Sequence, residues 1–478
     1  MIFVYIILGL IAILFFVCIL RFWLLKKSDK PQVSEVSSKE ALHFAETFKE
    51  MIQIKTLSYH KDKQNDQPFV ELKTWMRKTF PHVFETMEET SFKGESLLMH
   101  WKGASNERPI IIMSHLDVVD VDKDAWDHGP FSGEIIDGEI FGRGTLDTKS
   151  TVFAFYQACE SLIKEGFQPK QDVYLFSSTD EEIQGVGAET CVNYLQSKGV
   201  TPYMVLDEGG AIVSDSLPTV SQPLAMVGVV EKGYANIQFV AKSKGGHSST
   251  PPKHTPIARL SAFIHAVEKR FPLKTKMIPE VESIFKETAP YMKGLNRFLF
   301  INMWLFKPVI QWLLPKLSPY GRALLSTTIA FTMMEGSHQV NVIPSEATVT
   351  ANLRIHPIQN VDDSFRVLHT MAKKYDVEAI LLEHRNETPL TSTAGKAYQD
   401  LKAAILQVFP DVVVLPYVML GATDCRHFNQ LTDGALRFSP IRMNQKELSK
   451  MHGHNESIRI STLVEAIEFY KTVIKNHQ

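Results

Sequence analysis

Cysteine is scarce in this chain, and the few cysteines form no pattern. The 478 residues include only four, which are Cys18, Cys159, Cys191 and Cys425. They lie far apart, without the close pairing of a zinc knuckle, and Cys18 falls inside an apolar tract. At most one disulfide could form among the other three. The cysteines therefore exclude a zinc knuckle and do not indicate a compartment.

An excess of charge of either sign is also lacking. Lys and Arg together number 51 and Asp and Glu together 53, and no basic stripe stands out. A surface without concentrated positive charge does not attract a phosphate backbone, so we do not expect nucleic acid as a partner. The length exceeds what a single simple core requires, which favours two domains with additional segments.

Charge is absent altogether from residues 2–20. A helix of that length rises about 28 Å, close to the roughly 30 Å of a hydrocarbon core. Basic residues follow the apolar run, and they are Arg21, Lys26, Lys27 and Lys30. We therefore predict a single-pass transmembrane anchor over residues 1–27, which would locate the protein in a membrane.

A cleaved signal peptide is the alternative interpretation of this segment. The segment has no basic start and no small-x-small site before Arg21, so we favour the uncleaved anchor. The basic residues after the span favour a cytoplasmic main domain. Many single-pass ectoenzymes break this pattern, however, and the sequence leaves the side of the membrane open.

The rest of the chain divides into a linker and two kinds of domain. Residues 28–38 are polar and typical of a linker. Residues 39–230 alternate helical patterns with short apolar strands, which predicts an α/β domain with a doubly wound mixed sheet. Residues 231–356 contain stretches that alternate apolar and polar residues, as half-exposed antiparallel strands do. We predict an inserted α+β lid domain there, after which residues 357–478 return to the first domain.

One stretch inside this insertion is apolar enough to resemble a second membrane span. It covers residues 298–317, but Lys307, Pro308, Gln311 and Pro315 interrupt it. We predict a broken amphipathic helix pair, either packed on the protein or lying against lipid.

Five short polar segments hold the side chains that could carry chemistry. They are 115–117 (His-Leu-Asp), 144–147 (Gly-Thr-Leu-Asp), 180–182 (Asp-Glu-Glu), 206–210 (Leu-Asp-Glu-Gly-Gly) and 452–456 (His-Gly-His-Asn-Glu). Three of them follow apolar runs of the kind that form buried parallel strands. Ligands gather at the carboxyl ends of such strands, so we expect these segments to converge in one cleft.

These residue types suit a pair of divalent metal ions. Such a pair needs imidazoles and carboxylates from different strand ends, usually with one carboxylate bridging, and Asp147 stands where a glycine-rich loop meets a helix start. The adjacent Glu181 and Glu182 repel each other unless cations balance them. One can bind metal while the other takes a proton from the attacking water, as amide hydrolysis requires. Each segment alone would be a turn or a solvated helix start, and only the set predicts a function.

In order and spacing, the five segments resemble those of the M20 family of zinc peptidases, from about residue 45 to the C-terminus. The resemblance implies two Zn²⁺ ions per subunit. The metal ligands that it implies are His115, Asp147, Glu182, Asp207 and His452. Asp147 would bridge, with His115 and Asp207 on one ion and Glu182 and His452 on the other. His452 fits the His-x-x-Asn-Glu pattern of the family, whereas His454 falls at a variable position.

The resemblance also implies roles for residues that do not bind metal. Glu181 would be the general base and Asp117 the partner of the His115 imidazole. The lid segment 244–249 (Lys-Gly-Gly-His-Ser-Ser) resembles the one whose histidine, here His247, polarises the substrate carbonyl. In dimeric members the partner subunit supplies that histidine, so the insertion would be a lid and dimerisation domain in a possible homodimer.

Further matches concern the carboxylate of the substrate. Asn341 and Arg354 match substrate-carboxylate elements of the family, and an arginine on an otherwise apolar strand is costly unless it meets an anion. Gly421 and Thr423 belong to a loop that matches one near the same end of the substrate.

Several short sequence segments resemble those of one branch of the family, which contains carboxypeptidase S and N-fatty-acyl-amino-acid synthase/hydrolase. The implied activity is cleavage or formation of the amide between an acyl or aminoacyl group and an amino acid with a free carboxylate. Its substrates would be small molecules, either N-acyl amino acids or dipeptides. Residues 177–179 (Ser-Ser-Thr) replace a Gly-His pair of the mammalian enzyme, which leaves the fine preference open. The alternatives are another M20 dipeptidase or deacylase, or a non-catalytic membrane-tethered binding protein, for which a ligand or the base should be missing.

Overall fold

The computed structural model describes residues 2–24, 38–59, 65–217 and 220–477. The predicted linker falls outside these ranges except for Ser38, and so do Met1 and residues 25–27 of the predicted anchor.

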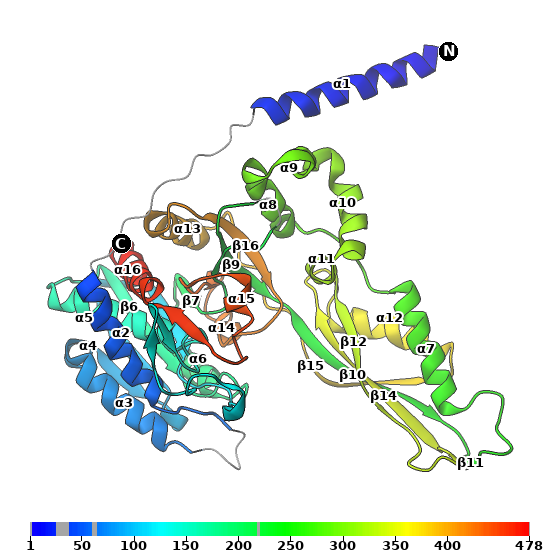
Figure 1. Cartoon of the computed structure of the whole chain (residues 1–478), viewed down its shortest axis with the longest axis horizontal. Helices are drawn as coiled ribbons and strands as arrows, with labels where there is room; N and C mark the ends of the chain where they lie inside the picture. The colour runs from blue at the N-terminus through cyan, green and yellow to red at the C-terminus, as the bar shows by residue number, and fades with distance from the viewer. Residues whose placement is uncertain (1, 25–37, 60–64, 218–219, 478) are drawn as a thin grey trace.

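The larger domain is built on a ten-stranded mixed sheet (Figure 1). In spatial order its strands are β1 (Glu88–Ser91), β2 (Leu97–Trp101), β6 (Gln171–Ser178), β3 (Ser105–His115), β7 (Met204–Asp207), β17 (Ala435–Arg437), β9 (Leu224–Glu231), β8 (Ile212–Val213) and β18 (Arg442–Met443), with β16 (Val413–Met419) beside β9. Strands β6, β3, β7 and β17 run parallel to one another, and β1, β2 and β9 have antiparallel partners. The predicted mixed sheet is confirmed.

Helices cover both faces of this sheet because alternate strand residues point to opposite sides. Ile110 and Ile112 of β3 pack into one core with helices α2 (Ser38–Gln53), α5 (Lys149–Lys164) and α16 (Ile460–Asn476). Ile111 and Met113 pack on the other side with α6 (Gly187–Ser197) and α14 (Cys425–Phe428). Further helices of this domain are α3 (Gln67–Thr79), α4 (Pro81–Thr86), α13 (Lys396–Val408) and α15 (Gln445–Leu448). A small sheet of β19 (Ser457–Arg459), β5 (Glu139–Phe141) and β4 (Ile135–Ile136) completes it.

The lid is a four-stranded antiparallel sheet that projects away from the larger domain (Figure 1). Its spatial order is β12 (Thr328–Glu335), β14 (Glu346–Ile355), β10 (Gly233–Lys242) and β15 (Glu378–Arg385). Helices α7 (Pro256–Arg270) and α12 (Val361–Lys373) share its hydrophobic core. The two strands expected from alternating residues are therefore present as β10 and β14.

The predicted end of the lid at residue 356 is wrong. Strand β15 pairs with β10, and Leu368 and Ala372 of α12 are buried in the lid core, so the lid continues to about Arg385. The middle of the insertion belongs elsewhere, because Val281 and Phe285 of α8 (Pro279–Thr288) join the core of the larger domain.

The apolar stretch inside the insertion forms two helices, α9 (Gly294–Ile301) and α10 (Met303–Leu317), followed by α11 (Pro319–Leu325). The axes of α9 and α10 meet at a bend of 112°, so the predicted broken pair is confirmed. Among the described residues, no single helix is long and apolar enough to cross a bilayer, and only α9 and α10 taken together pass that test. The N-terminal helix α1 (Ile2–Leu24) includes a shorter apolar stretch, and the predicted transmembrane anchor stays a prediction.

Candidate metal centre

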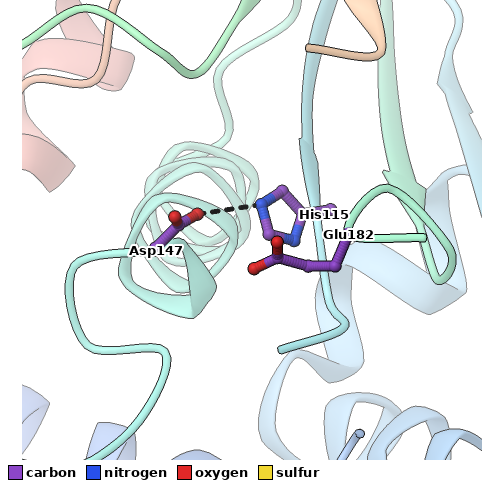
Figure 2. A group of neighbouring side chains, drawn as sticks. All are labelled: His115, Asp147 and Glu182. Carbon is purple, nitrogen blue, oxygen red and sulfur yellow. Dashed lines mark hydrogen bonds and ion pairs between the residues drawn. The ribbon is translucent and has the colours of Figure 1, made fainter. Parts of the chain in front are cut away.

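Four of the predicted side chains meet at the carboxyl ends of the parallel strands. Asp147 places Oδ1 3.0 Å from Nε2 of His115 and Oδ2 3.0 Å from Nε2 of His452. Glu182 also contacts His452, with its Oε1 3.3 Å from the same Nε2 atom. Potential ligand atoms of His115, Asp147 and Glu182 lie within 4.8 Å of one another, and Figure 2 shows the three side chains facing a common centre. One carboxylate with an oxygen toward each imidazole is the arrangement of a bridging ligand.

Strand register explains why distant segments converge. His115 ends β3 directly opposite Ser178 at the end of β6, and the Asp-Glu-Glu segment follows two residues later. On the other side of β3, Ile112 is level with Leu206, so β7 delivers Asp207 to the same edge. The apolar runs that precede these segments thus position them as the sequence predicts.

Glu456 holds the Asp147 loop in place. Its Oε1 accepts hydrogen bonds from the backbone amides of Leu146 (2.6 Å) and Asp147 (3.2 Å), and its Oε2 accepts one from Arg143 (2.8 Å). Arg143 also donates to the carbonyl oxygen of Gly453 at 2.9 Å, which ties this loop to the His452 segment. The last of the five segments therefore supplies both an imidazole and the carboxylate that orients Asp147.

Asp117 acts on backbone rather than mainly on the imidazole. Its Oδ1 accepts the amide of Glu181 at 3.2 Å and its Oδ2 accepts the amide of Glu182 at 3.1 Å. Nδ1 of His115 lies 2.9 Å from the carbonyl oxygen of Asp117 and 3.4 Å from its carboxylate. The backbone of Asp117 therefore orients the ring, and its buried carboxylate positions the two glutamates.

The three acidic residues of the third segment have different roles. Asp180 accepts the amides of Val186 (2.8 Å) and Gly187 (3.1 Å) at the start of α6, so its charge stabilises that helix end. Of the three residues, only Glu181 and Glu182 therefore remain as candidate members of the metal cluster. Burial raises the pKa of Glu181 well above its ordinary value, and His115 opposes this rise. A carboxyl group with a raised pKa suits repeated proton transfer near neutral pH.

The charges of the cluster indicate that a cation belongs in it. Pairing with Asp147 and Glu182 raises the pKa of His452 to about 10. Burial opposes ionisation of Asp147, yet hydrogen bonds from His115 and His452 lower its pKa. Oε1 of Glu182 is buried and accepts no hydrogen bond, although it lies within ion-pair distance of His452. The carboxylates of the cluster thus favour positive charge on the imidazoles, and metal ions compete with protons for such ligands.

Asp207 and its neighbour Glu208 divide their contacts in a way that the sequence did not indicate. Oδ1 of Asp207 accepts the amide of Glu208 and Oδ2 accepts the amide of Cys425, both at 2.8 Å. Burial raises the pKa of Glu208, the negative charges of Asp147 and Asp207 raise it further, and the charge of His115 lowers it. The only sequence signal was that two acidic residues stand side by side.

His247 and Asn341 lie together at the far tip of the lid. His247 belongs to β11 (Gly246–His247), which pairs with β13 (Val342–Ile343), and the amide of Ser248 donates to the Asn341 carbonyl at 3.0 Å. Strand β10 leads from the larger domain to this tip and spans roughly 30 Å at about 3.4 Å per residue. The structure therefore does not bring His247 or Asn341 to the metal cluster of the same chain (Figure 1).

Arg354 lies at the opposite end of the lid, beside the larger domain. It is level with Tyr234 of β10, which is level with Arg385 of β15, so the three side chains share a face of the sheet. The Arg385 guanidinium lies 5.5 Å from the centre of the Tyr234 ring. Burial lowers the pKa of Arg385, as do the charges of Arg426 and Arg354, and its Nε is buried without a hydrogen-bond partner among the described residues.

This group of three arginines borders the loop that the sequence singled out. Thr423 is buried and its hydroxyl donates to Glu231 at 3.1 Å, while Gly421 is exposed on the loop after β16. Arg426 follows in α14 and donates to the Thr423 carbonyl oxygen at 2.9 Å. The sequence predicts Arg354 as a carboxylate-binding residue but does not predict Arg385 or Arg426. Arg385 also lies on a strand, so the same signal was present there.

The fold and the cluster of imidazoles and carboxylates at its strand ends define a candidate metal site, and comparison with known proteins identifies the family. The model of peptidase family M20/M25/M40 matches residues 111–476, which include all five polar segments. The chain belongs to this family and is a hydrolytic enzyme.

Curated relatives match over nearly the whole chain. N-fatty-acyl-amino acid synthase/hydrolase PM20D1 of Xenopus tropicalis is 35% identical over 450 residues, covering 93% of this chain and 88% of that protein. Probable carboxypeptidase S-like 2 of Dictyostelium discoideum is 33% identical, covering 93% and 86%. Among solved structures, an M20 family metallo-carboxypeptidase of Sulfolobus solfataricus, Sso-CP2, has a TM-score of 0.66 at 19% identity, covering 92% and 99%. That likeness shows the shared fold.

Proposed function

We propose that this enzyme is a di-zinc amidohydrolase. It cleaves, or forms in reverse, the amide between an acyl or aminoacyl group and the nitrogen of an amino acid with a free carboxylate. The observation that carries the proposal is that Asp147 directs one oxygen to each of two imidazoles, beside Glu182, whose buried Oε1 accepts no hydrogen bond. The names of the relatives support the substrate class, since they include an N-fatty-acyl-amino acid synthase/hydrolase and a carboxypeptidase S-like protein.

The donor set fits two zinc ions. Imidazole nitrogens and carboxylate oxygens are ordinary zinc ligands, and Oε1 of Glu182 is buried and accepts no hydrogen bond. Glu182 and His452 would hold one ion, His115 and Asp207 the other, and Asp147 both. Each oxygen of Asp207 accepts one backbone amide and keeps a second lone pair for a metal ion, and such hydrogen bonds orient a ligating carboxylate. When bound, the ions would polarise the scissile carbonyl and increase the acidity of the attacking water.

The protein groups around the ions would manage the protons. Glu181 would take a proton from the attacking water and return it to the leaving nitrogen. Asp117 would keep Glu181 and Glu182 at the required spacing through their amides. This division explains why two adjacent glutamates share one acidic segment.

The arginine group would recognise the free carboxylate of the amino acid. Arg354 and Arg385 face the same side of the lid sheet, and Arg426 approaches from the larger domain. Three guanidinium groups that repel one another are stabilised by an anion, and their forked donors suit a carboxylate. The loop with Gly421 and Thr423 lies beside them.

We further propose that the enzyme is a homodimer in which each lid completes the site of the other subunit. His247 and Asn341 are too far along the lid to serve their own cluster, yet they lie together at its tip. In the partner, His247 would stabilise the oxyanion that forms on the substrate carbonyl.

We also propose that α1 anchors the enzyme in a membrane as a single-pass helix. Residues 2–20 carry no charged side chain, and Ile13, Phe16 and Trp23 are more than half exposed, with exposed fractions of 61%, 64% and 77%. A helix that is apolar on all sides is stable when lipid or protein surrounds it.

Substrate comparison tests the proposed activity. The purified full-length enzyme with zinc is assayed on Gly-Leu, N-oleoyl-Phe and N-acetyl-Leu. Turnover of Gly-Leu would indicate a Gly-Xaa carboxypeptidase, turnover of N-oleoyl-Phe a fatty-acyl-amino-acid hydrolase, and turnover of N-acetyl-Leu alone a short-chain deacylase. If none of the three is cleaved while zinc is bound, the proposed substrate class is wrong.

The base assignment has its own test. Glu181→Gln removes the proton acceptor but leaves the side-chain volume and the amide contact to Asp117, so zinc content should equal that of the wild type. Turnover should fall by about 10²-fold or more. Retention of more than a few per cent of activity would show that another group is the base.

A further inference from the structure

The outer face of α10 is apolar although it is exposed. Its inner face packs on the larger domain through Met303 and Ile310, which are buried, and Phe306 and Leu314, which are partly buried. An ordinary surface helix would be polar on the opposite side. Here the exposed side chains of α10 and its neighbours are instead Leu295, Trp304, Leu305, Val309, Trp312, Leu313, Leu317 and Tyr320.

The few cations of this helix do not interrupt the apolar face. The ammonium group of Lys307 forms an ion pair with Glu282 of α8. Lys316 folds over the ring of Trp312, with Nζ 3.4 Å from the ring centre, near the C-terminal end of α10. Lysine and tryptophan side chains with an apolar body and a polar end are typical of the boundary between lipid and water.

This face is continuous with the N-terminal helix. The ring of Phe298 in α9 lies 6.3 Å, centre to centre, from the rings of both Phe15 and Phe22 of α1. The side-chain amide of Asn302 donates to the carbonyl oxygen of Cys18 at 3.3 Å, and the guanidinium of Arg297 lies 4.9 Å from the centre of the Phe22 ring. The contacts of α9 with α1 thus extend from Phe15 to Phe22, about 10 Å along the axis of α1.

We infer that α9 and α10 form a second membrane contact, inserted into the leaflet that α1 enters. The inference rests on the proposed anchoring of α1. If lipid surrounds α1, its contacts with Phe298 carry α9 along about 10 Å of α1, within one leaflet of a hydrocarbon core roughly 30 Å thick. Arg297, next to Phe22, then lies toward the headgroups.

A lipid surface explains the exposed face better than a second copy of the chain does. A copy seated on α10 would leave the apolar surface of α1 uncovered, whereas one bilayer covers α1, α9 and α10 together. The bend of 112° between α9 and α10 prevents a straight crossing and suits a pair of helices lying in the interface.

An environment-sensitive fluorophore tests this placement in the full chain. All four natural cysteines are buried, so a cysteine introduced at Trp312 (Trp312→Cys) can be labelled selectively. Glu189→Cys, exposed on α6, is the matched control. Each labelled protein is reconstituted into phosphatidylcholine vesicles with and without lipids that carry a nitroxide quencher in the acyl chain.

The label at position 312 should shift its emission to shorter wavelength and lose more than half of it to the quencher. The label at position 189 should show neither change. If the protein floats with the vesicles but position 312 behaves like position 189, α1 is anchored and the second contact is refuted. If the protein does not float with the vesicles, both the anchor and the inference fail, while the assay for amide hydrolysis is unaffected.

Discussion

Replacing Asp117 with asparagine separates two roles that this buried residue could have. In the structure its carboxylate accepts hydrogen bonds from the backbone amides of Glu181 and Glu182. Its backbone carbonyl oxygen lies 2.9 Å from Nδ1 of His115 and accepts a hydrogen bond from it. Asparagine keeps one oxygen and turns the other acceptor into a donor, which then faces a backbone N–H. The substitution therefore disturbs the glutamates and leaves the contact of the imidazole with the backbone intact.

The size of the effect follows from the lost hydrogen bond. A bond to a charged acceptor contributes roughly 1.5–3 kcal/mol, and leaving its buried donor unsatisfied costs about 1–3 kcal/mol. We expect a loss of about 3–5 kcal/mol in the free energy of unfolding, which a domain of about 5–15 kcal/mol can survive. A displacement of Glu181 by about 1 Å should lower kcat by roughly 10²-fold.

The assay compares kcat, zinc content and thermal unfolding of wild type and Asp117→Asn. Asp172→Asn is the control, since Asp172 is also buried and accepts the amide of Gly103 and the imidazole of His100, both at 2.8 Å, at the other end of the sheet. It should lose stability but keep its kcat. If Asp117→Asn instead keeps kcat per bound zinc and loses zinc affinity by about 10-fold or more, the carboxylate acts on the His115 ring and the reasoning is refuted.

Three further predictions concern the substrate site, the assembly and the core. Arg385→Met should raise KM by about 10-fold or more with little change in kcat, because it removes a donor to the substrate carboxylate; an unchanged KM in steady-state assays would exclude it from the site. Mixing inactive Glu181→Gln and His247→Ala proteins should restore activity, because a mixed dimer has one site with both groups intact, and continued inactivity after subunit exchange would contradict a shared site. Arg437→Met should cost about 3–5 kcal/mol in chemical unfolding, because it leaves Glu231 buried without its ion-pair partner at 2.9 Å. The exposed pair of Lys396 and Asp400 provides the comparison, with an expected loss below about 1 kcal/mol for Lys396→Met.

Sequence patterns predict the strands that carry the candidate metal site well, because local features of the sequence determine these strands. An apolar run that ends in a polar residue becomes a buried strand with that residue at its carboxyl end, as at His115 and Asp207. The break in the 298–317 stretch, by contrast, falls at Asn302, while Pro308 and Pro315 lie inside α10, so the sequence predicts a broken pair but not where it breaks.

Features that depend on distant pairing were not accessible in the same way. The alternation of strand β15 does not say which sheet it joins, so the lid boundary was placed too early. The contacts of the Asp207 carboxylate depend on how the chain leaves β7 and on the amide of Cys425, 218 residues away. Arg385 and Arg426 converge from a lid strand and a helix of the larger domain, and no spacing in the sequence relates them.

The central claim is that distant segments bind a pair of neighbouring zinc ions around Asp147. Anomalous diffraction at the zinc edge from crystals of the zinc-loaded enzyme tests it most directly. We predict two peaks about 3.5–4 Å apart, one next to His115 and the other next to His452, with Asp147 between them. A single peak, or zinc bound away from these residues, would contradict the account.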